Sequence, residues 1–493
     1  MKYCVAISEE IHQLLISHLI RDDGQEDLCF AFYSTSTGKT RITGVINTIM
    51  LPNEGDRNVH GNVSFNSQYF DRVTQFALKK QLGICFIHSH PGPGWQGMSF
   101  DDIKAEEMLA PRVKAITKIP LIGLTIGNDE TWSARFWIKI KPKIYSKYWC
   151  ESVRVVGQRL SISYNEKLLP SPAKSKEFQR TISSWGAAMQ ADITRLKVGI
   201  VGLGSVGSLV ATALYRTGVK NVKFIDFDIV KEKNLDRMDV PRSDIGQFKA
   251  SAVKKRLLLN ELHSVIIEDI PYSIIEKEGL EKALDCDVIF CGVDRPWPRF
   301  VLDSFSKANY IPVIDGGIDA NPKSNSSNLD QARWKSHTVG PGRVCMNCLN
   351  QYQPEDVALE QSGLLEDQHY IKSLPRSHFI NRGENVYIFS QSLASQLMCQ
   401  FLSLILQPRG IPYGPKEFDF NTGNIDSDYE FLCSGDCSID AKKGKGDQIN
   451  KTLISKHKAA EDIRKQANNL TAIDSWTKIL NWFHRFSKIW RKI

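Results

Sequence analysis

The chain has 493 residues, with 42% hydrophobic and 24% charged residues and a formal net charge of +8. This length suffices for more than one hydrophobic core, and the composition is ordinary for a soluble globular protein. The basic excess is concentrated between Lys442 and Ile493. The body of the chain is therefore closer to neutral, which argues against a protein that coats nucleic acid and indicates a basic tail instead.

The N-terminus and the cysteines indicate a cytoplasmic protein. Glu9 and Glu10 follow the start closely, and there is no long apolar core or small-residue cleavage site, so we expect no signal peptide. The uncharged run 198–215 resembles a membrane span, but its glycines form a dinucleotide-binding pattern. The 11 cysteines, an odd number, lack the spacing of small disulfide-bonded domains and indicate reduced thiols.

Residues 1–155 are predicted to form a mixed α/β domain, because helix-like and strand-like periodicities alternate along them. Helical periodicity covers residues 7–20, 69–80 and 101–108. Strand-like segments cover residues 28–33, 42–49, 84–87, 121–126 and 133–140.

A second domain is predicted over residues 178–438, after a connecting stretch over 156–177 whose prolines and lysines are typical of a linker. A strand over 197–201, a helix over 207–217 and a strand over 222–225 give the βαβ order that opens a Rossmann-like sheet. The remaining residues, 439–493, are first polar and then form an amphipathic pattern.

Two histidines in the first domain belong to a candidate metal site. His88 and His90 follow a predicted strand, and Asp102 lies near the start of the next predicted helix. Because residues two apart in a strand share a face, both imidazoles can reach one ion. Imidazole and carboxylate are ordinary zinc ligands, and three protein ligands leave a fourth position for a reactive water. The pattern therefore predicts a catalytic zinc site.

A zinc hydrolase also needs a base that takes a proton from the water. Glu26, at the mouth of the predicted strand 28–33, is the residue expected in this role, and Glu54, in a loop, is the alternative. Ser99 lies beside Asp102, and its hydroxyl is suited to steady an oxyanion. The competing interpretation is a pair of structural histidines beside a helix whose N-cap is Ser99.

This part of the chain resembles the JAMM (JAB/MPN) metalloprotease family, whose pattern is an upstream Glu, then His-Ser/Thr-His-Pro, then Ser-x-x-Asp. The resemblance covers about the first third of the chain and implies a JAB/MPN fold that cleaves peptide or isopeptide bonds after ubiquitin-like C-termini. It implies zinc ligation by His88, His90 and Asp102, with Glu26 as the general base. The gap before Ser99 is one residue longer than the family spacing, so Asp101 is an alternative ligand.

The second domain opens with a glycine-rich loop. Gly202, Gly204 and Gly207 follow a strand and begin a helix, so backbone N–H groups can approach phosphates at the helix N-terminus. Asp226 and Asp228 end the next strand, where an acid suits a ribose hydroxyl. These features alone are also expected of a nicotinamide-dependent dehydrogenase.

Further polar residues favour ATP and a metal over hydride transfer. Arg237 and Lys249 place positive charge near the phosphates, and Asp294, at a strand end, is suited to hold Mg²⁺. The set resembles the ThiF-type fold of ubiquitin-activating enzymes, which adenylate the C-terminal glycine of a ubiquitin-like protein. The resemblance covers about half of the chain. It implies that Asp228 and Asn234 contact the nucleoside, that Arg237 and Lys249 contact the phosphates, and that Asp294 binds the magnesium.

The resemblance also extends to the stretch 178–186 before this fold. It implies that Arg180 reaches the ATP of a partner subunit, and therefore that the protein is a homodimer.

The spacing of two cysteine pairs suits a closed structural zinc site. These residues are Cys345, Cys348, Cys433 and Cys437. The competing interpretation is four ordinary buried thiols. A thioester-forming cysteine is not evident, because Cys399 lies in an apolar run and Cys291 at a strand end, where packing in the core is expected for both.

The last residues form an apolar stripe at helical spacing from Trp476 to Ile493, with basic residues mainly elsewhere on the helix. This pattern is typical of a helix that lies on a membrane surface or docks on a partner. It is also typical of a helix that packs on the chain itself or on a second copy, and this second interpretation is the one we favour.

Taken together, the motifs predict a bifunctional enzyme with two zinc ions, ATP and Mg²⁺. One domain trims or removes a ubiquitin-like protein, and the other adenylates its terminal glycine, with a conjugating enzyme as a further partner. Activation of a sulfur-carrier protein, followed by thiocarboxylate formation, is the alternative. A scaffold with degenerate sites is the non-enzymatic interpretation, against which the intact ligand sets argue.

Overall fold

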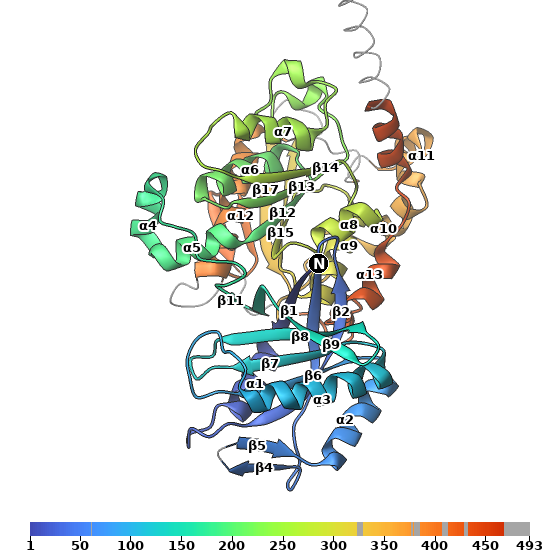
Figure 1. Ribbon diagram of the computed structural model, residues 1–493. Helices are drawn as coiled ribbons and strands as arrows, with labels where there is room; N and C mark the ends of the chain where they lie inside the picture. Colours follow the sequence, from blue (N-terminus) through green and yellow to red (C-terminus); the bar gives the residue numbers. More distant parts are fainter. Residues whose placement is uncertain are drawn as a thin grey trace, which may run out of the picture.

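The computed structural model describes residues 1–60, 62–322, 329–375, 378, 385–406, 413–427 and 432–467. One sheet of nine strands and one of eight form the centres of the two halves of the molecule (Figure 1). The predicted α/β class is confirmed for both halves. The amphipathic pattern between Trp476 and Ile493 lies outside the described residues.

The first sheet has the strand order β11-β10-β1-β3-β2-β6-β7-β8-β9 and is mixed, since β1 runs parallel to β3 and β10 whereas β2 runs antiparallel to β3 and β6. Its strands are β1 (Lys2–Ser8), β2 (Leu28–Thr37), β3 (Arg41–Met50), β6 (Gly83–Ser89), β7 (Leu121–Ile126), β8 (Trp132–Lys141), β9 (Ile144–Trp149), β10 (Ser152–Val156) and β11 (Leu160–Tyr164). A separate hairpin consists of β4 (Arg57–His60) and β5 (Asn62–Phe65). The strand β11 lies in residues that the sequence assigned to the connecting stretch.

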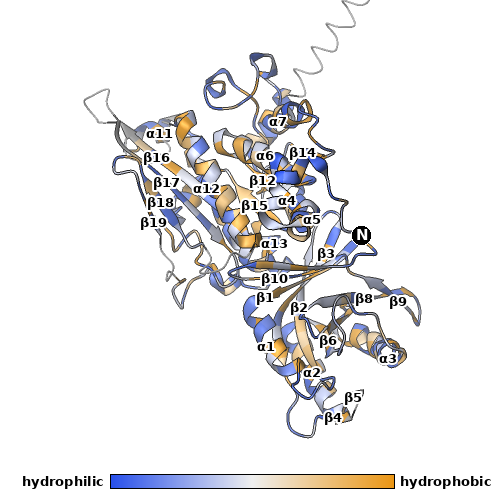
Figure 2. Cartoon of the chain, turned by 90° about the vertical axis from the view of Figure 1, so that its left-hand side faces the viewer, coloured by the Kyte–Doolittle hydropathy of each residue, from blue (hydrophilic) through white to orange (hydrophobic). Residues whose placement is uncertain are grey.

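Three helices cover this sheet: α1 (Glu9–Leu19), α2 (Ser67–Lys80) and α3 (Phe100–Thr117). The apolar side of α1 packs in one core, and α2 and α3 pack in another on the opposite face (Figure 2). The helix expected from residue 7 begins at Glu9, because residues 2–8 form β1 and the Ser8 hydroxyl accepts from the N–H of Ile11. The helix α3 extends well beyond residue 108, to Thr117.

The second sheet has the order β14-β13-β12-β15-β16-β17-β18-β19. The first five strands in this order are parallel to one another, and each of the last three, β17, β18 and β19, is antiparallel to the strand before it. Its strands are β12 (Lys197–Val201), β13 (Asn221–Ile225), β14 (Ile266–Ile270), β15 (Val288–Cys291), β16 (Val313–Pro322), β17 (Leu329–Val339), β18 (Lys416–Asp419) and β19 (Asn424–Ser427). The strands β12 and β13 and the helix between them lie where the sequence predicts them.

The helices of this half are α4 (Gln179–Trp185), α5 (Ala187–Arg195), α6 (Ser205–Thr217), α7 (Lys249–Leu258), α8 (Lys277–Ala283), α9 (Pro296–Asn309), α10 (Pro354–Gln361), α11 (Gln368–Ser373), α12 (Tyr387–Leu406) and α13 (Asp447–Leu453). The helices α6, α7 and α12 pack on one face, and α8 and α9 pack on the other. Among the described residues, α12 has the length and apolarity of a membrane span, but 61% of its most apolar window is buried in the protein. The helix α12 is therefore a core helix of this half.

The two halves meet at a buried, charged junction. Arg41 and Arg154 of the first sheet are each 1% exposed. Arg41 Nη1 donates to Asp287 Oδ1 at 2.5 Å, and Arg154 Nη1 lies 3.7 Å from the same oxygen. Apolar side chains of both halves, including Val45 and Leu196, share one core around this pair. The halves are therefore joined by a continuous interior.

Removal of the shared carboxylate is expected to destabilise the fold. Burial alone raises the pKa of Asp287, but Arg41, Lys197 and Arg154 outweigh it and lower the pKa. Asp287→Ala leaves two buried guanidinium groups without their counter-charge, which costs ~3–5 kcal/mol. We expect a lower denaturant midpoint for unfolding. Because the pKa of Asp287 is lowered on folding, the difference from the wild type is present above about pH 4 and shrinks as the pH falls.

Asp239→Ala is the matched control, because this carboxylate is 61% exposed and pairs with Arg256 on the surface at 3.3 Å. Its loss is expected to change stability by less than ~1 kcal/mol. Equal midpoints for the two variants at neutral pH would show that the junction contributes no net stability.

Candidate functional site

The first candidate site lies where β6 ends and α3 begins. His88 Nε2 is 3.2 Å from His90 Nε2, and the two carboxylate oxygens of Asp102 each lie 3.3 Å from one of these nitrogens. Ligands about 2.0–2.1 Å from a tetrahedral zinc lie about 3.3 Å from one another. The three side chains therefore have the spacing of zinc ligands. Asp101 is exposed and is not part of this cluster of described residues.

Local backbone contacts fix the cluster. The N–H of Ser89 donates to the carbonyl of Asp27 at 3.0 Å, and the N–H of His90 donates to Ile126 at 2.8 Å. Ser99 is the N-cap of α3: its hydroxyl accepts from the N–H of Asp102 at 3.1 Å, and the Asp102 carboxylate accepts from the N–H of Ser99 at 2.7 Å. This capping box orients the carboxylate. The Ser99 hydroxyl uses a lone pair here, so its O–H can still donate to a substrate oxygen.

Glu26 is adjacent to the cluster without being part of it. Its carboxylate oxygen lies 4.0 Å from His90 Nε2, and the side chain is 25% exposed. The neighbouring carboxylate of Asp27 is 1% exposed and accepts from Arg21 at 3.3 Å and from Arg57 at 2.7 Å, which holds this loop in place. Glu54, the alternative base, is exposed in the turn that precedes β4. Of the two glutamates, Glu26 is the one described in contact with the cluster.

A buried polar chain behind the cluster is not evident from the motifs. Thr125 Oγ1 lies 3.4 Å from His88 Nε2 and accepts from Arg135 Nη1 at 2.6 Å. Arg135 also pairs with Glu106 of α3, and both side chains are fully buried. This network links the helix of Asp102 to the strand of His88. The signal in the sequence is Arg135, a charged residue flanked by apolar residues in the buried part of β8.

The glycine-rich loop of the second half joins β12 to α6. Gly202 has a φ of +91°, and a Cβ at Gly207 would lie 1.9 Å from the carbonyl oxygen of Gly202. A Cβ at Gly204, the N-cap of α6, would meet nothing within 4 Å. The turn therefore requires glycine at positions 202 and 207. Gly204, in contrast, leaves open space at a helix N-terminus, where phosphates bind.

Charged side chains gather beside this loop. Asp226 accepts from the N–H of Leu203 at 2.6 Å and from that of Asp228 at 2.8 Å, so it holds the loop. Lys249 Nζ donates to Asp228 Oδ2 at 2.6 Å. Burial lowers the pKa of Lys249, but Asp226, Asp228 and Asp294 outweigh it and raise the pKa. The structure therefore brings together the predicted Lys249, Asp228 and Asp294.

Three other predicted residues have different surroundings. Asn234 accepts from the N–H of Lys231 at 2.9 Å, and Arg237 donates to the carbonyl of Lys233 at 3.2 Å. Arg180 is exposed on α4. Among the described contacts, none joins these three side chains to Lys249 or to the glycine-rich loop.

The four predicted zinc-binding cysteines come together in the second half. Cys437 Sγ lies 3.6 Å from Cys345 Sγ and 3.7 Å from Cys348 Sγ, and Cys433 belongs to the same cluster. Sulfur atoms about 2.3 Å from a tetrahedral zinc lie about 3.8 Å apart, so the cluster fits this ion. Cys291 is fully buried, and burial raises its pKa. Cys399 lies within α12. The position of Cys291 agrees with the expected packing in the core, whereas Cys399 is only partly buried.

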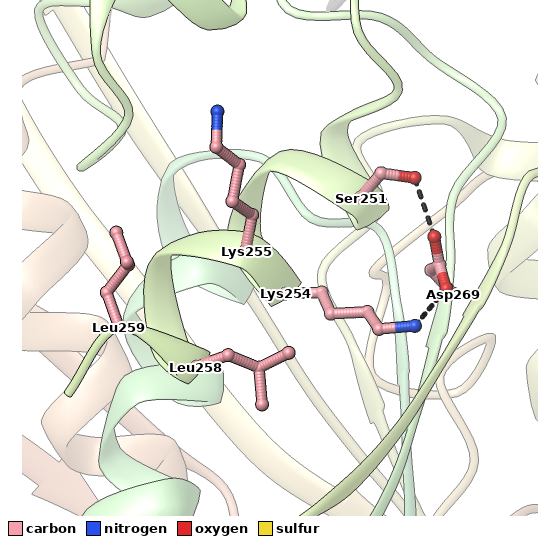
Figure 3. A pocket seen from close by; sticks show the side chains of 6 residues that line it. All are labelled: Ser251, Lys254, Lys255, Leu258, Leu259 and Asp269. Atoms are coloured by element: carbon pink, nitrogen blue, oxygen red, sulfur yellow. Dashed lines mark hydrogen bonds and ion pairs between the residues drawn. The ribbon is translucent and has the colours of Figure 1, made fainter. Parts of the chain in front are cut away.

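A surface hollow of about 420 Å³ lies beside α7 and β14 (Figure 3). Asp269 accepts from Ser251 at 2.7 Å and from Lys254 at 2.6 Å within it. The lining contains none of the predicted nucleotide residues. Its two lysines already pair with carboxylates, Lys254 with Asp269 and Lys255 with Asp244, so we assign it no role in the reaction.

The strand order, the glycine-rich loop and the charged cluster define a Rossmann-like α/β domain. Residues 178–364 match the ThiF family. This part of the chain therefore forms a ThiF-family domain.

The chain is 25% identical to ubiquitin-like modifier-activating enzyme 5 of Drosophila mojavensis over 189 residues, which is 35% of this chain and 46% of that protein. It is 23% identical to adenylyltransferase and sulfurtransferase MOCS3 of Caenorhabditis briggsae over 36% of this chain and 42% of that protein. The chain thus spans less than half of either relative. The crystal structure of E. coli MccB with ATP has a TM-score of 0.42 and 19% identity, covering 54% of this chain and 74% of that chain.

Each ligand cluster is expected to hold one metal ion. The purified wild-type chain should contain about two zinc ions, because both clusters have the donor set and spacing of zinc sites. His88→Ala and Cys345→Ser should each lose about one ion, measured by elemental analysis after exhaustive dialysis. Asp101→Ala is the matched control for Asp102→Ala and should retain both ions. Loss of zinc in the Asp101 variant would contradict the assigned ligand set.

Zinc binding at the first site is expected to weaken at acid pH. The hydrogen bond to Asp102 raises the pKa of His90, whereas zinc requires the neutral imidazole. Protons therefore compete with the metal below the raised pKa, and affinity should increase with pH until His90 is deprotonated. Competition with a chromogenic chelator in the Cys345→Ser variant isolates this site. A pH-independent affinity would contradict this account.

Proposed function

We propose that the protein is a bifunctional enzyme that acts on the C-terminus of a ubiquitin-like protein. One half is a zinc peptidase that trims or removes this protein, and the other half adenylates its terminal glycine. The cluster of His88, His90 and Asp102, with Glu26 at 4.0 Å, supports the first activity. The ThiF-family match and the group of Lys249, Asp228 and Asp294 support the second.

In the peptidase half, a bound zinc would polarise the scissile carbonyl and acidify a water. In this proposal Glu26 accepts the proton of that water and delivers it to the leaving amine. Ser99 donates its O–H to the oxygen that becomes negative, while the same hydroxyl keeps the cap of α3 in place. The buried network of Thr125, Arg135 and Glu106 holds the ligands against the sheet.

In the adenylation half, the substrate carboxylate attacks the α-phosphorus of ATP, and pyrophosphate leaves as the phosphoanhydride bond breaks. The N-terminus of α6 and Lys249 neutralise the phosphates. Asp294 is suited to hold the magnesium ion, and Asp228 is suited to bind the ribose. Arg180 is exposed on α4, and we propose that it reaches the site of a second copy in a homodimer.

The names of the relatives favour a ubiquitin-like substrate, since they include ubiquitin-like modifier-activating enzyme 5 and a NEDD8-activating enzyme catalytic subunit. A conjugating enzyme would then receive the activated protein. The second candidate is a sulfur-carrier substrate. It is favoured by the likeness to adenylyltransferase and sulfurtransferase MOCS3 and by the full burial of Cys291.

Exchange of labelled pyrophosphate into ATP tests the proposal. Exchange should depend on a small protein that ends in glycine, and absence of exchange with every such protein would overturn it. Sulfide-dependent formation of a thiocarboxylate distinguishes the sulfur-carrier route from transfer to a conjugating enzyme.

Variants should separate the two activities. Glu26→Gln is expected to lower cleavage of a C-terminally extended precursor by about 10²–10⁴-fold, because the general base is lost. Pyrophosphate exchange with the mature protein should stay unchanged. Asp294→Asn should have the reverse effect, measured on the same two substrates. Parallel loss of both activities in either variant would contradict independent sites.

A further inference from the structure

The segment that follows Cys437, the last residue of the four-cysteine cluster, packs against the rest of the protein. The side chain of Asp447 in α13 accepts from the N–H of Thr37 at 2.9 Å and from the Thr37 hydroxyl at 2.6 Å. Leu453, at the end of α13, is 4% exposed in the core of the second half. The chain then continues into residues 454–467, of which 458–467 are helical. In Figure 1 this red helix follows α13 along the second half.

His457 lies between two aromatic side chains of the second half. Its ring is 4.9 Å from that of Phe227, nearly perpendicular to it, and 5.9 Å from that of Trp297. Just before it, the N–H of Ser455 donates to the carbonyl of Ile275 at 2.9 Å. His457 thus joins residues that are 70 positions apart in the sequence.

Arg464 holds the helix 458–467 against the residues that follow β14, the neighbour of β13 in the sheet. Its guanidinium donates to the carbonyl of Pro271 at 3.2 Å and to both oxygens of Glu276 at 2.8 and 2.5 Å. It also lies 4.3 Å from the centre of the Tyr272 ring. Glu276 is only 6% exposed, so this bidentate pair is largely removed from solvent.

The residues held in this way frame the candidate nucleotide site. Phe227 stands between Asp226 and Asp228 after β13, and Pro271 directly follows β14. Trp297 lies three residues after Asp294, beyond β15. In doubly wound sheets the ligand binds outside the carboxyl ends of such strands. One segment, distant in sequence, therefore contacts three of the chain ends that must be aligned around the ligand.

We propose that residues 455–467 form the outer wall of the nucleotide site, in which His457 and Arg464 are positioning residues for the nucleoside half of ATP. His457 fixes Phe227 and, through the backbone, the neighbouring Asp228. Arg464 fixes the turn after β14. The proposal rests on the ATP site of the proposed function, and it adds to the ThiF-family domain a wall that lies outside residues 178–364.

Calorimetric titration of the full chain with ATP and Mg²⁺ tests this assignment without depending on turnover. His457→Ala and Arg464→Ala are each expected to raise the Kd for ATP about tenfold, or about 1.4 kcal/mol. His457→Phe keeps a ring of similar shape between Phe227 and Trp297 and should retain nearly wild-type affinity. Lys465→Ala, with a side chain that is 72% exposed in the same helix, is the matched control.

Steady-state measurements give a second readout. The KM for ATP should rise in the His457→Ala variant, while kcat, the KM for the protein substrate and cleavage at the metal site stay unchanged. Hydrogen exchange of residues 455–467 should slow when ATP binds. Wild-type affinity for ATP in both alanine variants overturns the proposal, and so does a hydrogen-exchange rate in residues 455–467 that does not change when ATP binds. ATP binding without pyrophosphate exchange would overturn the adenylation activity and leave the wall supported.

Discussion

The carboxylate of Asp287, shared by two buried arginines, is the interaction on which the rest of the architecture depends. Arg41 and Arg154 come from one sheet, and Asp287 directly precedes β15 of the other. A buried charge is tolerated only when it is paired, so the junction is strongly specified once these groups leave water. The apolar side chains around them then form one interior instead of two opposed surfaces. The two halves consequently act as one folded unit.

The position of this junction explains why both candidate sites remain accessible. Arg41 begins β3, and Asp287 directly precedes β15, so these two charges lie at the amino ends of their strands, whereas Arg154 lies within β10. His88 lies at the carboxyl end of β6, and the glycine-rich loop follows the carboxyl end of β12. The pair of Arg41 and Asp287 therefore lies at the strand ends opposite to those that carry the two candidate sites.

Each site depends on support from residues distant in the sequence. Behind the candidate zinc ligands, Arg135 contacts Thr125 and Glu106. It thereby couples the strand of His88 to the helix of Asp102. At the candidate nucleotide site, the segment of His457 contacts residues that follow the ends of several strands. Such support limits the freedom of the groups that bind ligands, and precise placement of those groups is what catalysis requires.

The sequence by itself determined the local features: the pairing of His88 and His90 by strand periodicity, the glycine-rich turn, and the cap of α3 by Ser99. These depend on geometry within a few residues, which spacing encodes directly. It left open whether Asp101 or Asp102 faces the histidines, because one residue changes direction by about 100° around a helix axis.

Only the tertiary structure decided the long-range contacts. Arg41 and Asp287 are 246 residues apart, and Arg464 and Glu276 are 188 apart. Neither pair leaves a periodic signal, because each forms only where two separately folded surfaces meet. The sequence therefore predicted which chemical groups are present, whereas the packing of the two halves and of the segment 455–467 decided which distant groups surround them.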